Sequence, residues 1–402
     1  MSKRLATLHA KHFDEMSDDE HEKINNDLSK IISNSVDVLL KESSELIVEV
    51  NNGKKDRKEL ESKIAEITNS KQLNIHDRNS LIEGVLNYIF YYGKLQPLVE
   101  DEDITDIDFT AYNYGVIKRN GVKELIGKKY LFPSEFDFCK YSQTLILRNE
   151  GIINENYSHE RVSDEKYRLR INVSIPPRNL KHTSLNIRKH RQNPYTLDVL
   201  KELKMINEEQ KELLEKIINQ KNRFIIAGKG ASGKTTLLRA MLMNVNPLDT
   251  YLVAEKDTEL YLDHSNFIQQ RIKKENHGGL QITLGDLIKD GLTMSLDGYV
   301  VGEIVSDEAW YFINAGVTDH MVAGTVHANS SLDVPHRLLS LVETFNPGIK
   351  SETILNLIAK SLDYIIYLKD FKVEEIASVG EFDSKKDSID ISLLMKGDAD
   401  GR

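Results

Sequence analysis

One stretch decides the fold of this chain: Phe224-Ile225-Ile226-Ala227-Gly228-Lys229-Gly230-Ala231-Ser232-Gly233-Lys234-Thr235. Its last eight residues match the template G-x-x-x-x-G-K-[ST] at every fixed position. The four apolar residues before the loop indicate a buried strand, and the run Thr236 to Leu242 after it indicates a packed helix. A strand, a glycine-rich loop and a helix in this order predict a phosphate-binding loop.

The residue types in this loop suit the phosphates of a nucleotide. Glycines let the backbone turn tightly, so that N–H groups face phosphate oxygens, and the helix dipole adds positive potential. We expect Lys234 to reach the β- and γ-phosphates and Thr235 to place its hydroxyl on a magnesium ion. The predicted ligands are ATP or GTP with Mg²⁺. The predicted phosphate-binding residues are Gly228, Lys229, Gly230, Ala231, Ser232, Gly233, Lys234, Thr235 and Thr236.

Composition excludes several classes of protein. The 402 residues are enough for two or three domains, and the net charge of −10 gives no overall attraction to nucleic acid or anionic lipid. We therefore expect no direct binding of nucleic acid. Cys139 is the only cysteine, so an internal disulfide is impossible and a reducing cytoplasm is expected. No apolar run is long enough to span a bilayer, so we expect membrane association only through a partner.

The first half of the chain has two predicted zones. Residues 1–75 are rich in charge and predict a helical extension. Its apolar positions at helical spacing are Ile24, Leu28, Ile31, Ile32, Val36 and Leu39. Residues 76–193 mix helix and strand signals and predict a smaller α+β N-terminal domain. Those signals are a helix over Leu81–Tyr92, strands that include Ile104–Phe109 with an Asn120-Gly121 turn, and a basic strand pair over Tyr167–Val173 and Ser184–Lys189.

The second half, residues 194–402, has the rhythm of a mostly parallel sheet covered by helices, with strands expected near 223, 251, 299, 321 and 364. Three of these strands end in polar residues. Glu255 and Glu259 follow the second strand, Glu303 follows the third and His327 follows the fourth. Because carboxyl ends of parallel strands share one edge, we expect these groups beside the phosphate loop, with Glu303 as a magnesium-side carboxylate.

At this point the sequence resembles the superfamily of ATPases that drive type II and type IV secretion and type IV pili. It looks most like the branch of conjugation and tight-adherence pilus ATPases, over about residues 80 to 380. The motifs that carry the resemblance are Tyr92 to Leu98, Ile104 to Ile107, Arg170-Ile171-Asn172, Ile175-Pro176-Pro177, Ile187-Arg188-Lys189, the loop Gly228 to Thr235, an acidic box Glu255 to Leu260, the Walker B end Val301-Gly302-Glu303 and a histidine box Gly324 to Ser330.

The resemblance implies an α/β fold with a RecA-like P-loop ATPase domain, assembled as a homo-hexamer. It implies ATP hydrolysis with Mg²⁺ at the cytoplasmic face of the cell membrane, where an inner-membrane platform protein would receive the motion. Glu259 or Glu255 would polarise the attacking water, and Glu303 would order the magnesium shell, in part through water. His327 would sense the γ-phosphate. Arg170 and Arg188 would neutralise phosphate charge.

This chain departs from the family pattern at a few positions. Lys256 stands where an aspartate is usual, and Thr293 and Ser295 stand where arginines are usual before Glu303. We therefore expect slow basal turnover unless a partner stimulates it. Two alternatives to a secretion motor remain open at this stage: a hexameric nucleic-acid translocase, and a nucleotide-dependent scaffold with weak catalysis.

Overall fold

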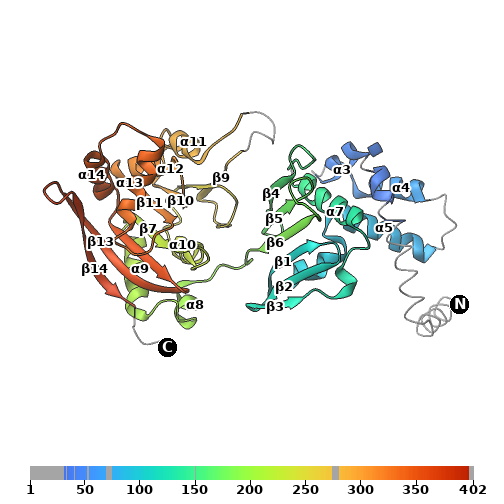
Figure 1. Cartoon of the computed structure of the whole chain (residues 1–402), viewed down its shortest axis with the longest axis horizontal. Coiled ribbons are helices and arrows are strands. Elements are labelled where there is room, and N and C mark those ends of the chain that lie inside the picture. Colours follow the sequence, from blue (N-terminus) through green and yellow to red (C-terminus); the bar gives the residue numbers. More distant parts are fainter. Residues whose placement is uncertain are drawn as a thin grey trace. The chain divides into compact units, whose positions relative to one another are not determined.

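The computed structural model describes residues 31–32, 34–39, 41–51, 54–68, 75–149, 151–273 and 280–397. These residues group into two compact units. Unit 1 is drawn from Met1–Asn149, Ile153–Glu160 and Ile171–Arg188, and unit 2 from Glu150–Ile152, Arg161–Arg170 and Lys189–Arg402. Together they give a mixed α/β architecture. Figure 1 labels the helices and strands of both units.

The described part of the expected extension is helical. Its helices are α3 (Ser44–Asn51) and α4 (Arg57–Thr68), which are followed by α5 (Ile75–Phe90). The predicted positions Val36 and Leu39 are fully buried and join a cluster with Leu60 and Ile64 of α4. Residues of α5 complete this cluster, so the apolar stripe seen in the sequence is a packing face. Ile24 and Leu28 lie outside the described residues.

Unit 1 also contains most of a six-stranded sheet, in the order β3-β2-β1-β6-β5-β4. Its strands are β1 (Ile104–Ala111), β2 (Tyr114–Arg119), β3 (Val122–Leu125), β4 (His159–Asp164), β5 (Leu169–Ser174) and β6 (Ser184–Lys189). The short helices η1 (Gly93–Leu95) and α6 (Gln96–Glu100) lead into β1, and η2 (Lys128–Tyr130) and α7 (Glu135–Arg148) follow β3. The predicted Asn120-Gly121 turn joins β2 to β3, and both of its residues have positive φ, at 47° and 83°.

Unit 2 is built on an eight-stranded sheet in the order β14-β13-β12-β7-β11-β10-β8-β9. The strands are β7 (Phe224–Gly228), β8 (Tyr251–Glu255), β9 (Phe267–Arg271), β10 (Gly298–Ile304), β11 (Met321–Val326), β12 (Tyr364–Lys369), β13 (Lys372–Asp383) and β14 (Ser388–Lys396). The six from β12 to β9 run parallel. Their carboxyl ends therefore meet at one edge. The strands expected near 223, 251, 299, 321 and 364 are confirmed.

Helices cover both faces of this sheet. They are α8 (Leu197–Glu202), α9 (Glu208–Asn219), α10 (Lys234–Leu242), α11 (Leu284–Gly291), α12 (Glu308–Val317), α13 (Val334–Phe345) and α14 (Ser351–Ser361). Every residue of β7 is buried. Phe224 and Ile226 pack into one core with α8, α9 and α10, whereas Ile225 and Ala227 face the core formed with α11 to α14. Successive side chains of β7 alternate between the two faces of the sheet, and both faces are buried. The strand is therefore a continuous apolar run.

The sheet is larger than the sequence indicated. Strand β9 extends one edge, and β13 with β14 adds an antiparallel pair at the other, visible as a long ribbon in Figure 1. Burial along β13 and β14 is irregular, with many intermediate and exposed positions. Edge strands of this kind lack the apolar run that marks β7, and this is why sequence pattern alone did not predict them.

Candidate functional site

The predicted phosphate loop lies between β7 and α10. Gly228, at the end of β7, has φ 153°, and a Cβ atom there would lie 2.5 Å from the main-chain oxygen of Leu368. Gly233 has φ 95° and precedes the first residue of α10. Both positions require glycine, because a side chain would clash or strain the backbone. The sequence therefore folds here into a tight turn that delivers Lys234 at the start of a helix.

Lys234 lies under this turn with only 7% of its surface exposed. Its Nζ donates to the main-chain oxygens of Gly228 at 3.0 Å and Lys229 at 2.8 Å. Burial lowers the pKa of Lys234, and the nearby carboxylates of Glu303 and Glu259 oppose that shift. The structure thus brings the loop lysine together with two of the predicted acidic residues.

The other loop residues divide into an exposed rim and a buried base. Lys229, Gly230 and Ala231 are exposed. Ser232 is 5% exposed, and its Oγ has no hydrogen-bond partner among the residues that the structure describes. Such a buried hydroxyl is available to a ligand held by the loop.

Thr235 and Thr236, in the first turn of α10, line a cavity of about 110 Å³. Glu259 and Arg239 line the same cavity. The position expected to hold a metal-bound hydroxyl therefore lines the same small cavity as the candidate base.

Glu255 ends β8 and is 4% exposed. Its Oε1 accepts hydrogen bonds from the main-chain N–H groups of Glu259 at 3.1 Å and Leu260 at 3.0 Å. Burial raises the pKa of Glu255 to about 8, against the opposite effect of these hydrogen bonds. Glu255 therefore holds the following turn in place and keeps its proton near neutral pH. Glu259 is more accessible than Glu255, because 30% of its side chain is exposed.

Three arginines from the β4–β5 region pair with the acidic segment 257–263. Arg170 forms an ion pair with Glu259, which joins two of the predicted site residues. Sequence reasoning missed the other two pairs, Arg161 with Asp257 at 2.5 Å and Arg168 with Asp263 at 2.6 Å. All six residues belong to unit 2.

Two further features of the acidic box were not predicted from the sequence. Lys256 is exposed and makes no ion pair within the described part of the chain. Asp257, one position later, is instead held by Arg161. The signal for these pairings was the basic strand region itself, but its partners could not be read from the sequence.

Glu303 and His327 meet where β10 and β11 lie side by side. The Nε2 of His327 is 2.7 Å from Oε1 of Glu303. Thr325 of β11 donates its hydroxyl to the main-chain oxygen of Gly302 at 2.6 Å, which fastens the two strand ends together. A Cβ atom on Gly230 would lie 3.8 Å from Cε1 of His327, so the imidazole stands next to the loop rim.

Arg188 belongs to unit 1. Its Nε lies 3.2 Å from Oδ1 of Asp106 on the neighbouring strand β1, and the side chain is 48% exposed. Within unit 1, the Arg188 side chain is therefore paired with the carboxylate of Asp106.

Among residues 31–397, apart from the gaps given above, no group of three or more His, Cys, Asp or Glu side chains is arranged to hold a metal ion by itself. No helix in that part of the chain combines the length and the apolar character that crossing a bilayer requires.

The chain is similar to several known proteins. The type II/IV secretion system protein family matches residues 155–370, more than half of the chain. A putative conjugal transfer protein of Mycobacterium tuberculosis strain H37Rv is 31% identical over 257 residues, which are 62% of this chain and 72% of that protein. Protein VirB11 of Rhizobium radiobacter is 25% identical over 160 residues, which are 39% of this chain and 46% of that protein.

Among solved structures, the chain is similar to the pilus retraction motor PilT with bound ADP. The TM-score is 0.51 at 17% identity, over 76% of this chain and 83% of that one. At this identity the likeness shows the fold alone. The family match and the ordered motifs together lead to one conclusion: this chain belongs to the type II/IV secretion system protein family.

Proposed function

We propose that this chain is an ATPase that drives a type II or type IV secretion, pilus-assembly or conjugation apparatus. The observation that carries the proposal is the meeting of Lys234, Glu259 and Glu303 at one edge of a parallel sheet. Membership of the family supports it. The fold we propose is a RecA-like P-loop ATPase domain over residues 194–402, with a smaller α+β domain over 76–193 and a helical extension over 1–75.

In this proposal the loop binds the phosphates of ATP. Three features of the loop suit a bound phosphate group. They are the tight backbone turn at Gly228, the Oγ of Ser232 without a described hydrogen-bond partner and the buried ammonium of Lys234. Lys234 would exchange its two main-chain acceptors for β- and γ-phosphate oxygens. Thr235 and Glu303 supply the hard oxygen donors that suit Mg²⁺, with water completing the shell. When bound, Mg²⁺ would neutralise phosphate charge as it develops.

We assign separate roles to Glu255 and Glu259, the two glutamates of the acidic box. Glu259 is partly exposed and lines the cavity next to Thr235, so it is placed to polarise a water molecule. Glu255 keeps a proton near neutral pH and holds the main chain of Glu259. His327 would sense the γ-phosphate, and its contact with Glu303 would let the carboxylate respond to whether that phosphate is present. Arg170 and Arg188 remain our candidates for neutralising phosphate charge.

The assembly that we propose is a homo-hexamer at the cytoplasmic face of the membrane, attached through an inner-membrane platform protein. Hydrolysis there would drive movement of the platform. We expect slow basal turnover, because charged groups that are usual in the family are missing around the site. Lys256 replaces an acidic residue, and Thr293 and Ser295 replace arginines.

The test is hydrolysis of MgATP by the purified full chain, with Lys234→Ala and a matched surface control, Lys216→Ala on α9. We expect measurable hydrolysis in the wild type and the control, and none in Lys234→Ala. Tight ATP binding without any hydrolysis in the wild type would show that the chain is a nucleotide-dependent scaffold and not a motor. Strong stimulation of hydrolysis by single-stranded DNA would show that the chain is a nucleic-acid translocase.

A further inference from the structure

An arginine on the phosphate-loop helix is used in a way that the proposed chemistry does not explain. Arg239 is 6% exposed, and its guanidinium donates only to main-chain oxygens in the contacts that the structure describes. These oxygens are those of Arg191 at 3.0 Å, Gln192 at 3.4 Å and Tyr261 at 3.1 Å. One side chain on α10 therefore joins the segment before α8 to the segment after Glu259.

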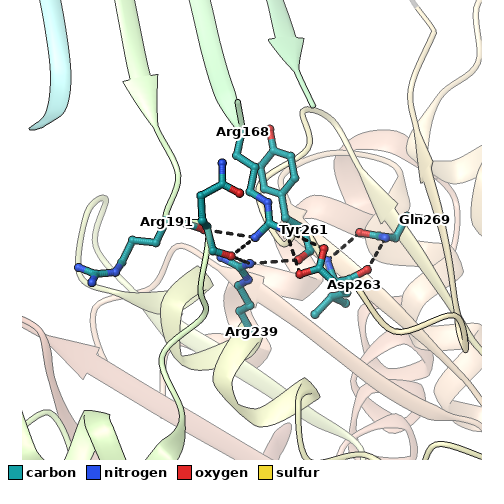
Figure 2. Close-up of polar contacts among 8 residues, drawn as sticks. Arg168, Arg191, Arg239, Tyr261, Asp263 and Gln269 are labelled. Carbon is teal, nitrogen blue, oxygen red and sulfur yellow. Dashed lines mark hydrogen bonds and ion pairs between the residues drawn. The ribbon is translucent and has the colours of Figure 1, made fainter. Parts of the chain in front are cut away.

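A second arginine reaches the same two carbonyl groups from the β4–β5 turn. Arg168 donates to the main-chain oxygens of Arg191 and Gln192, and its Nη2 forms a forked pair with Asp263 at 2.6 and 2.8 Å. Figure 2 shows Arg168 and Arg239 converging on this segment from opposite sides. We call the set formed by Arg168, Arg239 and Asp263 the arginine clamp.

The clamp is connected to the candidate site through α10. Arg239 follows Thr235 by four residues, so the two side chains lie on the same face of the helix. Both line the cavity of about 110 Å³ that also contains Glu259. A shift of the first turn of α10 would therefore be felt at Arg239.

The clamp is also connected to the candidate base. Tyr261, whose carbonyl Arg239 holds, comes two residues after Glu259. The N–H of Glu259 is held by Glu255 on the other side. The turn that carries Glu259 is thus fixed at one end by the sheet and at the other by the phosphate-loop helix.

A role in packing alone accounts poorly for Arg239. Burying a cation carries a desolvation penalty that an apolar side chain of similar length, filling the same space, would avoid. Burial and the neighbouring Arg168 lower the pKa of Arg239 to about 10, so the cost is only partly offset by Asp263. A fork of donors that binds three main-chain oxygens in two segments fixes their relative position, which an apolar residue does not do.

On the basis of the ATPase function proposed above, we propose that Arg239 is a positioning residue. It couples the phosphate-loop helix to the turn that carries Glu259 and to the carbonyls of Arg191 and Gln192. Arg168 and Asp263 form the second half of the same clamp. Arg239 does not touch the reacting atoms; it sets where Glu259 stands when the loop is filled.

The experiment compares Arg239→Lys with Arg223→Lys in the full chain. Arg223 is a matched control, because it also binds main-chain oxygens, of Gly316 at 3.1 Å and Lys360 at 2.7 Å, and a carboxylate, that of Asp363. It lies just before β7, at the end of that strand opposite the phosphate loop. The measurements are kcat, the Kd for ATP, the Tm, and hydrogen exchange of peptides covering 189–195, 256–263 and 320–327.

We expect Arg239→Lys to lower kcat about tenfold to a hundredfold, since a small misplacement of a catalytic group has effects of this size. The Kd for ATP should stay within about threefold, because the loop itself is intact. Exchange should rise in 189–195 and 256–263 but not in 320–327. Asp263→Asn should raise exchange in the same two peptides. Arg223→Lys should lower the Tm without a selective fall in kcat.

Two results would overturn the clamp. One is a wild-type kcat and exchange pattern in Arg239→Lys. The other is a lower Tm in Arg239→Lys without a selective fall in kcat, as expected for the control. Failure of the ATPase function has a different signature, which is absence of hydrolysis in the wild type. In that case exchange alone judges the clamp. A rise confined to the two peptides supports it, and no rise rejects it.

Discussion

The Nε2 of His327 lies 2.7 Å from Oε1 of Glu303, which links the ends of two neighbouring parallel strands beside the phosphate loop. This contact places the proposed γ-phosphate sensor on the proposed magnesium-side carboxylate. We expect His327→Ala to lower kcat by roughly tenfold to a thousandfold, the range for losing one preorganised polar group. The Kd for ADP should change little, because the γ-phosphate is absent from ADP. Equal losses of ATP and ADP binding would contradict a sensing role.

The ion pair between Arg170 and Glu259 predicts coupling between two substitutions. We expect Glu259→Gln to lower kcat by about 10²-fold to 10⁴-fold, the usual contribution of a general base. Arg170→Gln should lower it as well, and the double variant should lose less than the product of the two, since groups in contact are not independent. Arg161→Gln, which frees Asp257 instead, is the control. Full additivity would show that Arg170 acts separately from Glu259.

The buried carboxyl of Glu255 predicts a pH-dependent stability. Its pKa is raised to about 8, so the folded chain holds a proton that the unfolded chain releases near pH 4.5. This contribution is complete at low pH and is lost as the pH rises toward 8. Glu255→Gln keeps the acceptor oxygen and removes the titration. Between pH 6 and 8 we expect the wild type to lose roughly 2 kcal/mol relative to the variant, measured by urea unfolding. Parallel pH profiles would contradict this.

Two glycines of the loop offer a matched pair of substitutions. Gly228→Ala places a Cβ atom 2.5 Å from a main-chain oxygen at φ 153°, and we expect it to destabilise the fold by roughly 1–3 kcal/mol. Gly230→Ala meets nothing closer than 3.8 Å and should change stability by less than about 0.5 kcal/mol. Thermal unfolding without nucleotide measures both. Similar losses of stability at the two positions would show that the loop does not need the close approach of Gly228 to the main-chain oxygen of Leu368.

Much of the central sheet of unit 2 could be predicted because its strands are buried on both faces. Such strands appear in the sequence as apolar runs, as in β7 and β11. The antiparallel pair β13 and β14 and the edge strand β9 could not, since an edge strand is only partly covered and its pattern is mixed. The turn at Asn120-Gly121 was predictable because its chemistry is local.

The sequence by itself determined the glycine-rich loop between β7 and α10, since all its residues are contiguous and glycine alone tolerates the backbone of Gly228 and Gly233. It also placed acidic residues and a histidine at strand ends. Only the tertiary structure decided which charges meet. Arg170 and Glu259 are 89 residues apart in the chain, and Arg168 and Asp263 are 95 apart. Arg239 offered no signal in the sequence, because its acceptors are main-chain oxygens that every residue possesses.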